Sequence, residues 1–259
     1  MNSENPFSTS ELKTTTSTLG ISTHGGYITN WQVKNTAGEM VPVFYVHPEK
    51  LKRTGIPPLL PYFGPSKDGQ HGFGRDSEWK YCELGKNEGI LILSSEQISD
   101  ETKAKYPYEF LATIDVKIAE NTLFYRMNFQ NLSNKPAPVL PGIHPYFHIP
   151  LAEKKFIKIS EIPEFDASKI DWTTEEPDVQ FPFGDQVTVE MPDRTISIKK
   201  GSGCKQIDRV TVWSEPGTDF ICVEPIAGKP GQMFDDDPIM LNPGENLLLD
   251  IQFAVIINP

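Results

Sequence analysis

The chain has 259 residues, a hydrophobic content of 38% and a net charge of −11, from 24 basic and 35 acidic side chains. This is enough chain for one sizeable core, and β-sandwiches of this length form single domains. The acidic charge argues against nucleic acid as a partner, and the sequence has no run of about 18 apolar residues that would predict a membrane span.

Residues 1–18 are rich in Ser, Thr, Asn and Glu and show no periodicity, which predicts a flexible arm or an edge strand. This stretch lacks the apolar segment of a signal peptide. The three cysteines have no CxxC spacing, and their odd number favours reduced thiols over a disulfide framework. We therefore expect a cytoplasmic protein in which residues 19–259 form one domain.

Alternation of apolar and polar residues dominates the rest of the chain. It is strict over residues 112–118 and 123–129 and returns at 187–191 and 196–198. This period of two is typical of half-buried strands. Residues 88–93 and 247–257 are denser apolar runs, which indicates strands covered on both faces.

Turn residues separate these segments, and helical periodicity is missing from the sequence. The chain has 19 glycines and 23 prolines, many of them in pairs or followed by polar residues. No stretch of about 11 residues repeats its apolar positions with a period of 3.6. The predicted fold class is therefore all-β, a large antiparallel sandwich.

Residues 50–80 form a basic window with a net charge of +3 in an acidic protein. They include the segment Gly69-Gln70-His71-Gly72-Phe73-Gly74-Arg75. Its glycines let the backbone approach a ligand closely, so His71 and Arg75 are well placed for a polar substrate. The alternatives are a solvated loop with ordinary surface charges and a histidine that caps a turn.

Two histidines stand four residues apart, at His144 and His148. On a helix this spacing would suggest a metal, but Pro145 and Pro150 oppose a helix. No further ligand follows at zinc spacing, so we expect no metal site. The aromatic residues at positions 146 and 147 are candidates for one wall of a ligand site.

Glu224 follows the apolar residues 221–223. A carboxylate at the end of an apolar strand is often partly desolvated, which raises its pKa and makes it a better base. The alternative is a strand-end glutamate that faces water.

Taken together, these segments resemble the aldose 1-epimerase (mutarotase) family, and most closely its hexose-6-phosphate branch. The resemblance runs from about residue 20 to 257 and is loose between the motifs. The motifs that carry it occur in the family's order: Arg53-Thr54-Gly55-Ile56-Pro57, Leu60-Pro61-Tyr62-Phe63-Gly64, His71–Arg75 with Trp79, Gly142–Phe147, Asp208-Arg209-Val210, Cys222–Pro225 and Asn242-Pro243-Gly244-Glu245.

The resemblance implies a galactose mutarotase-like β-supersandwich with isomerase activity. Such an enzyme interconverts the α and β anomers of a hexose, here a hexose 6-phosphate, and needs no metal or cofactor. Its partner is a small sugar or sugar phosphate. The motif matches imply that Glu224 is the general base, His144 the general acid and His71 an assisting group, that Asp208 holds a sugar hydroxyl, and that Arg53 and Arg75 contact the phosphate.

Two departures from the branch occur, with Gly74 in place of its usual Ala and Thr54 in place of a frequent Gly. Thr54 bears on the turn geometry at Arg53 and so on the phosphate contact. Two other functions stay open. One is a carbohydrate-binding sandwich without catalysis. The other is an epimerase for unphosphorylated sugar, in which the arginines pair with carboxylates such as Asp76 and Glu78. The sequence specifies neither the sugar nor the oligomeric state.

Overall fold

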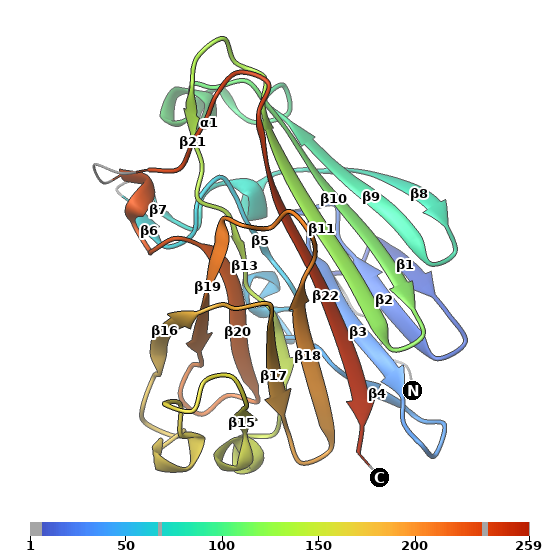
Figure 1. Ribbon diagram of the computed structural model, residues 1–259. Helices are drawn as coiled ribbons and strands as arrows, with labels where there is room; N and C mark the ends of the chain where they lie inside the picture. The colour runs from blue at the N-terminus through green and yellow to red at the C-terminus, as the bar shows by residue number, and fades with distance from the viewer. Residues whose placement is uncertain (1–6, 67–68, 235–237, 259) are drawn as a thin grey trace.

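The computed structural model describes residues 7–66, 69–234 and 238–258, which fold mostly into antiparallel strands (Figure 1). The largest sheet has eight strands in the order β15-β17-β18-β22-β11-β10-β9-β8. Its strands are β8 (Lys80–Gly85), β9 (Glu88–Ser94), β10 (Phe110–Ala119), β11 (Thr122–Asn131), β15 (Lys158–Ile159), β17 (Gln186–Glu190), β18 (Arg194–Lys200) and β22 (Asn246–Ile257). The predicted all-β antiparallel sandwich is confirmed.

The alternating segments form strands with one buried face, as their period of two predicts. Along β10, buried residues alternate with half-buried or exposed ones over all ten positions. The prediction that residues 88–93 and 247–257 are covered on both faces is wrong. β9 and β22 also alternate, because their outward apolar side chains are shielded only in part, by neighbours on the same face of a wide sheet.

A second sheet of six strands carries Glu224 and Asp208, and His144 lies between two of its strands. Its order is β16-β19-β20-β13-β5, and β14 also pairs with β20. All eight residues of β20 are buried, so this strand is covered on both faces. The strands are β5 (Pro58–Leu59), β13 (Gly142–Ile143), β14 (Tyr146–His148), β16 (Asp178–Pro182), β19 (Ile207–Trp213) and β20 (Phe220–Ala227).

The N-terminal part forms a third sheet, in the order β1-β2-β3-β4. Residues 10–13 form its edge strand, and residues 1–6 of the predicted arm lie outside the described part of the chain. The division into an arm and a single domain stays a prediction. The strands are β1 (Ser10–Lys13), β2 (Ser17–Ile21), β3 (Ile28–Lys34) and β4 (Met40–Pro42), and two small pairs join β6 (Pro65–Ser66) to β7 (Gly69–Gln70) and β12 (Ala137–Pro138) to β21 (Met240–Leu241).

Helices are short. The α-helix α1 (Asp100–Lys105) begins at Ser99, whose side chain accepts a hydrogen bond from the backbone of Thr102. Six residues are too few to show a period of 3.6, so the pattern analysis missed this helix. Of the helices that the structure describes, none has the length and apolar content to cross a bilayer. The 3₁₀ turns are η1 (Leu51–Arg53), η2 (Gly74–Asp76), η3 (Leu151–Phe156), η4 (Ala167–Lys169) and η5 (Gln232–Phe234).

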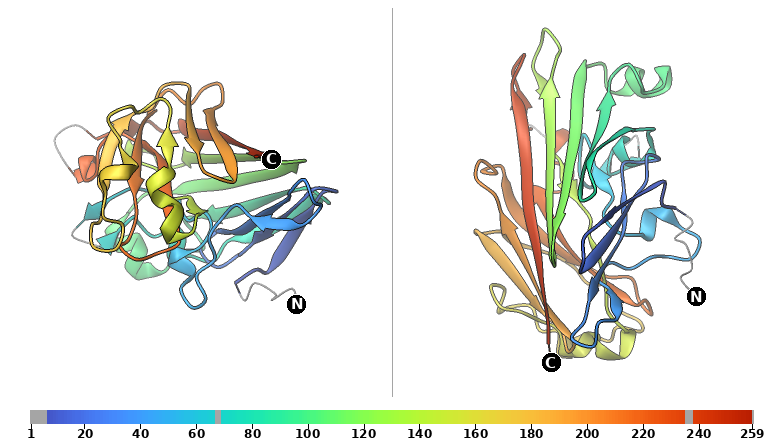
Figure 2. Two further views of the ribbon diagram at one scale, coloured as in Figure 1. Left: turned by 90° about the horizontal axis from the view of Figure 1, so that it is seen from below. Right: turned by 90° about the vertical axis from the view of Figure 1, so that its right-hand side faces the viewer.

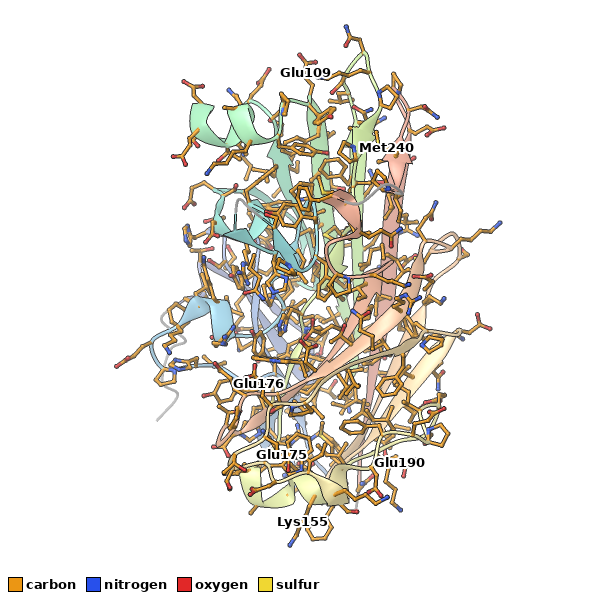
Figure 3. All side chains as sticks on the ribbon, turned by 90° about the vertical axis from the view of Figure 1, so that its left-hand side faces the viewer. Glu109, Lys155, Glu175, Glu176, Glu190 and Met240 are labelled. Atoms are coloured by element: carbon orange, nitrogen blue, oxygen red, sulfur yellow. The ribbon has the colours of Figure 1, made fainter. Side chains whose placement is uncertain are left out.

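The core lies between the sheets. The long strands β10, β11 and β22 run side by side, and the sheet of β19 and β20 packs across from β22 (Figures 1 and 2). Side chains fill the interior between them (Figure 3). Phe44 contacts both Phe147 of β14 and Phe253 of β22, at ring-centre distances of 5.6 and 6.2 Å. These aromatic contacts tie the site-bearing sheet to the large sheet.

Candidate active site

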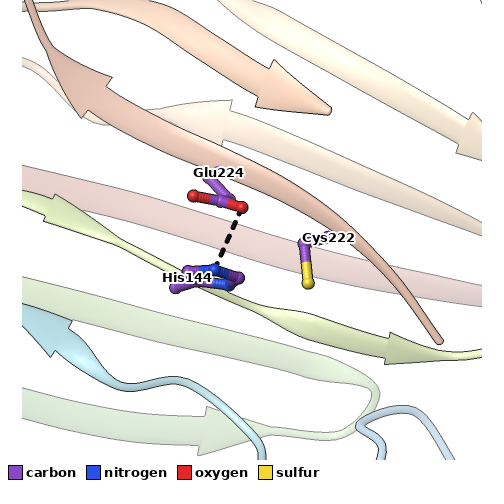
Figure 4. Close-up of side chains that lie close together, drawn as sticks. All are labelled: His144, Cys222 and Glu224. Carbon is purple, nitrogen blue, oxygen red and sulfur yellow. Dashed lines mark ion pairs between the residues drawn. The ribbon is translucent and has the colours of Figure 1, made fainter. Parts of the chain in front are cut away.

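The strand register brings His144 and Glu224 together. Gly142 pairs with Ile226 and Tyr146 pairs with Cys222 across neighbouring antiparallel strands. The same register places His144 opposite Glu224, and His144 Nε2 lies 3.3 Å from Glu224 Oε1 (Figure 4). Both side chains are buried, with 5% and 2% of their residue surface exposed.

His71 joins this pair from a glycine-rich loop. Its ring centre lies 5.8 Å from that of His144, edge to face. The backbone N–H of Gly64 donates to His71 Nδ1 at 3.1 Å, and the N–H of His71 donates to the carbonyl of Gly64 at 2.8 Å. Because Nδ1 accepts this bond, the neutral ring carries its proton on Nε2. His71 is therefore held as a hydrogen-bond donor.

Burial sets the charge states of these three groups. It lowers the pKa of His71 to about 3, with the positive charges of Arg75 and Arg53 acting in the same direction. Burial also lowers the pKa of His144, and His71 and the two arginines lower it further. It raises the pKa of Glu224, as Asp178 on β16 also does, while Arg53 opposes this rise. All three side chains thus favour their neutral forms.

Aromatic rings surround His144. Tyr146 stacks on it, with ring centres 4.6 Å apart and planes 7° apart, and Trp213 meets it edge-on at 5.3 Å. Tyr146 thus lies at the site, as the sequence suggested for an aromatic wall. Phe147 does not, because successive residues of a strand point to opposite faces and its ring packs in the core.

Arg53 is held by a carboxylate that the sequence analysis did not single out. Its Nε and Nη2 donate to the two oxygens of Glu215 at 3.1 and 3.2 Å, and its Nη1 donates to the Tyr146 hydroxyl at 3.3 Å. The guanidinium also lies over the ring of Trp213, 5.1 Å from its centre. Glu215 follows β19 in a turn more than 160 residues away, so no local pattern linked it to Arg53.

Asp76 and Glu78, which were considered as partners of the arginines, pair with other side chains. Asp76 pairs with Lys52 and Glu78 pairs with His24, each at 2.5 Å. The idea that Asp76 and Glu78 neutralise the arginines is therefore wrong. Both carboxylates are exposed, and a lysine and a histidine are their ion-pair partners.

Arg75 lines a cleft together with Arg53 and with Gln70, the residue before His71. Its Nη2 donates to the carbonyl of Gln70 at 3.1 Å, and its Nε is buried with no hydrogen-bond partner among the described residues. The Tyr27 hydroxyl is in the same state. The cleft has a volume of about 510 Å³ and is lined by His24, Tyr27, Lys50, Leu51, Lys52, Arg53, Gln70 and Arg75. This lining contains five basic side chains and no carboxylate, and the volume suits a small-molecule ligand.

Asp208 lies at an irregular point of β19, where the register with β20 shifts between Ile207 and Arg209. Its side chain is exposed, and Oδ1 accepts a hydrogen bond from the N–H of Gly228 at 3.0 Å. Its role as a sugar ligand stays a prediction. Asp178, which the sequence analysis missed, is the carboxylate that acts electrostatically on Glu224.

His144, Cys222 and Glu224 are the described residues grouped closely enough to be considered for a metal, since their ligand atoms all lie within 4.8 Å of one another (Figure 4). Zinc bonds of about 2.0–2.3 Å would draw such ligands to within about 3.8 Å of each other, so this set must contract to hold the ion. The charges of Arg53 and Arg75 also oppose a cation here. His148 lies apart, stacked on Tyr45. The arrangement fits proton transfer better than metal binding.

Several solved structures share the fold of this chain. The Slr1438 protein from Synechocystis sp. PCC 6803 is 21% identical, with a TM-score of 0.81 and 96% of each chain covered. A galactose mutarotase related enzyme from Lactobacillus acidophilus is 17% identical, with a TM-score of 0.77 over 95% of this chain and 97% of its own. A GalM/aldose epimerase homologue from C. elegans is 12% identical, with a TM-score of 0.74 over 96% and 98%.

A comparison with curated protein sequences gives no match. The family model described as aldose 1-epimerase, however, matches residues 9–254, which is nearly the whole chain. The match includes both strands of the histidine–glutamate pair, the loop of His71 and the two arginines. The chain therefore belongs to the aldose 1-epimerase family and is a sugar epimerase of the isomerase class.

Proposed function

We propose that this epimerase interconverts the α and β anomers of a hexose 6-phosphate, with His144 and Glu224 as its acid and base. The observation that carries the proposal is the buried imidazole–carboxylate pair at 3.3 Å, which Tyr146 and Arg53 connect to a cleft lined by basic side chains. Opening and closing a sugar ring needs one proton donor and one proton acceptor close together.

The reaction follows from these two groups. Glu224 takes the proton of the C1 hydroxyl, and His144 gives a proton to the ring oxygen as the bond between C1 and that oxygen breaks. The product is an open-chain aldehyde. Rotation about the C1–C2 bond presents the other face of the carbonyl, and the ring closes with both proton transfers reversed. An acid and a base of this kind each contribute about 10²–10⁴-fold to a rate.

The protonation of the pair matches this cycle. Burial favours a neutral His144 and a protonated Glu224, so in the resting pair the proton that can be transferred lies on Glu224. The imidazolium–carboxylate form that starts the reaction has the same total number of protons, with this proton on His144. A shift of one proton across 3.3 Å connects the two forms. His71, with its proton on Nε2, is positioned to donate a hydrogen bond to a sugar oxygen beside them.

Three features favour a phosphate on the substrate. Of the five basic side chains of the cleft, His24, Lys52 and Arg53 pair with carboxylates, while Lys50 and Arg75 form no ion pair with a described residue and are left to attract a dianion. Arg75 Nε and the Tyr27 hydroxyl are buried donors without partners among the described residues, and unsatisfied buried donors favour an acceptor-rich ligand. Thr54 stands where the hexose-6-phosphate branch often has Gly. It is buried and its hydroxyl donates to the carbonyl of Lys50, so it stabilises the turn that carries Arg53.

One observation favours an unphosphorylated hexose instead. Both oxygens of Glu215 already accept from the Arg53 guanidinium, so Arg53 has little free donor capacity for a phosphate. In this alternative Arg53 organises the site and the sugar carries no charge. The two functions share the same acid–base pair and differ only in the cleft.

Exchange spectroscopy by NMR on glucose 6-phosphate, glucose and galactose separates the two functions. We expect acceleration of anomer exchange for glucose 6-phosphate. Arg75→Ala should reduce kcat/KM for it by about 30-fold, the effect of losing a charge-assisted contact, while Lys80→Ala, on an exposed strand position, should leave it unchanged. Equal rates for all three sugars and an unaffected Arg75→Ala would remove the phosphate from the proposal. Tight sugar binding without acceleration would favour the carbohydrate-binding alternative.

We also place this activity in the cytoplasm. Cys82, Cys204 and Cys222 are all free thiols, and reduced thiols are typical of that compartment.

A further inference from the structure

Lys154 is a buried lysine that the proposed chemistry does not use. It lies in η3, and none of its surface is exposed. Its ammonium donates to Ser214 Oγ at 2.7 Å and to Thr218 Oγ1 at 3.4 Å, and the rings of Trp172 and Phe220 lie 5.1 and 5.6 Å from it. Burial of an ammonium costs several kcal/mol even when hydrogen bonds compensate in part. No carboxylate among the described residues forms an ion pair with this ammonium, so the buried charge needs an explanation.

Both hydroxyls belong to the turn between β19 and β20, residues 214–219. Ser214 Oγ donates its proton to the carbonyl of Phe220 at 2.9 Å, and Thr218 Oγ1 donates to the carbonyl of Glu215 at 2.7 Å. A hydroxyl has one proton, so the remaining lone pairs face the ammonium. Lys154 thus completes the hydrogen bonding of the turn from its inner side.

Two further contacts join η3 and the residues just before it to the same turn. Asp219 Oδ1 accepts from the N–H of Leu151 at 2.8 Å, and the Asp219 carbonyl accepts from the N–H of Ile149 at 3.0 Å. Burial lowers the pKa of Lys154 to about 8, and the nearby Cys222 and Asp219 act in the opposite direction. The ammonium is therefore mostly charged at neutral pH, when it holds the turn.

The outer side of this turn carries Glu215, whose two oxygens hold the Arg53 guanidinium. Arg53 donates in turn to the hydroxyl of Tyr146. The ring of Tyr146 stacks on His144 at 4.6 Å. A continuous series of contacts thus runs from the buried ammonium to the acid–base pair, through a turn that η3 supports from behind.

We propose that Lys154 is a positioning residue, which orders the β19–β20 turn so that Glu215 keeps Arg53 in place against Tyr146. Lys154 touches neither substrate nor reacting atoms and acts through the turn. The inference rests on the epimerase activity of the family and does not require a phosphate on the sugar.

Lys154→Met tests the proposal, with Lys155→Met as its matched control. Lys155 is the next residue of η3 and points outward (Figure 3). Methionine is one atom shorter than lysine and removes its charge, so it fills most of the same space, and we expect a melting temperature no lower than that of the wild type. We expect kcat/KM to fall about tenfold, a size of effect that contacts outside the site transmit. Unchanged activity in a folded Lys154→Met protein would overturn the proposal.

A double-mutant cycle with Glu215→Gln identifies the route. Glu215→Gln weakens the pair with Arg53 at a partly exposed position, where it leaves the fold intact. If Lys154 acts through Glu215, the double variant should be no slower than Glu215→Gln alone. Losses that multiply would show that Lys154 acts by another path, and the assignment would fail.

An NMR readout of Arg53 makes the test independent of any substrate. The Nε–H signal of Arg53, assigned by its loss in Arg53→Lys, reports its bond to Glu215. We expect it to shift or broaden in Lys154→Met and to stay in place in Lys155→Met. If Lys154→Met does not fold, Thr218→Val replaces it, because that variant removes one hydroxyl of the turn and keeps the lysine. An unmoved signal would contradict the positioning role even if the enzyme acts on a different sugar.

Discussion

At the scale of single residues, burial determines the protonation of the proposed acid–base pair. A carboxylate and an imidazole that work in water would be charged and neutral, respectively, at pH 7. Here burial raises the pKa of Glu224 and lowers that of His144. An ionisable side chain buried in this way lowers the stability of the folded protein, a cost that is common at catalytic sites and that supports the proposed role of Glu224 as the base.

Replacement of Glu224 by glutamine should separate stability from activity. The folded pKa of Glu224 lies above its unfolded value of 4.5, so the folded state keeps a proton that the unfolded chain loses above that pH. The free energy of unfolding therefore falls as pH rises through this range. We expect Glu224→Gln to be more stable than the wild type at pH 8 and equally stable at pH 4, and to lose about 10²–10⁴-fold in exchange rate.

Urea unfolding at both pH values measures the first effect and NMR exchange the second. Glu83→Gln, at an exposed position of β8, is the control and should change neither. A stability difference for Glu224→Gln that is the same at pH 4 and pH 8 would show that Glu224 does not carry this linkage.

At the scale of elements, the loop before η2 determines where His71 points. His71 has a φ of +65°, unusual for a residue with a side chain, and Gly72 beside it has a φ of +65°. A Cβ on Gly72 would lie 2.1 Å from the carbonyl oxygen of Leu60. The loop can therefore keep His71 at the pair only if this position is a glycine.

Gly72→Ala should move His71 away from His144 and reduce kcat/KM by about 10²-fold, the cost of a misplaced catalytic group. Gly244→Ala is the matched control, because its φ is +82° but a Cβ there meets nothing within 4 Å. That variant should lose about 1–2 kcal/mol of stability from backbone strain and no activity. Kinetics and thermal unfolding of both variants check the prediction, and full activity in Gly72→Ala would contradict it.

At the scale of the whole molecule, one aromatic cluster joins the two large sheets. Phe253 of β22 contacts Phe44 and Phe147, and it is fully buried. Phe253→Ala should lower the free energy of unfolding by about 3–5 kcal/mol, the usual cost of a buried phenylalanine. Phe124→Ala, on the adjacent strand but 39% exposed, should cost about 0.5 kcal/mol or less. Equal losses for the two variants in denaturant titrations would show that this cluster does not hold the sheets together.

The sequence predicted what repeats locally and missed what depends on distant pairing. The strands β10 and β11 were predictable because ten alternating residues leave little ambiguity. The two-residue strands β5 and β13 have no period, although they help to place His144. Motifs singled out His144, Glu224 and His71, whose side chains the structure brings together. Glu215, Asp178 and Lys154 were missed, because their importance comes from neighbours that lie far away in the sequence.

The pairing of β20 with the segment from β13 to β14 also has a consequence for how the protein acquires its activity. His144 and Glu224 come from parts of the chain separated by 80 residues and meet only in one alignment of the strands. A slip by one residue would turn either side chain to the opposite face. Contacts so distant in the sequence form late and slowly during folding. In a refolding experiment, the rate at which enzymatic activity returns therefore measures the rate at which these strands reach the correct register.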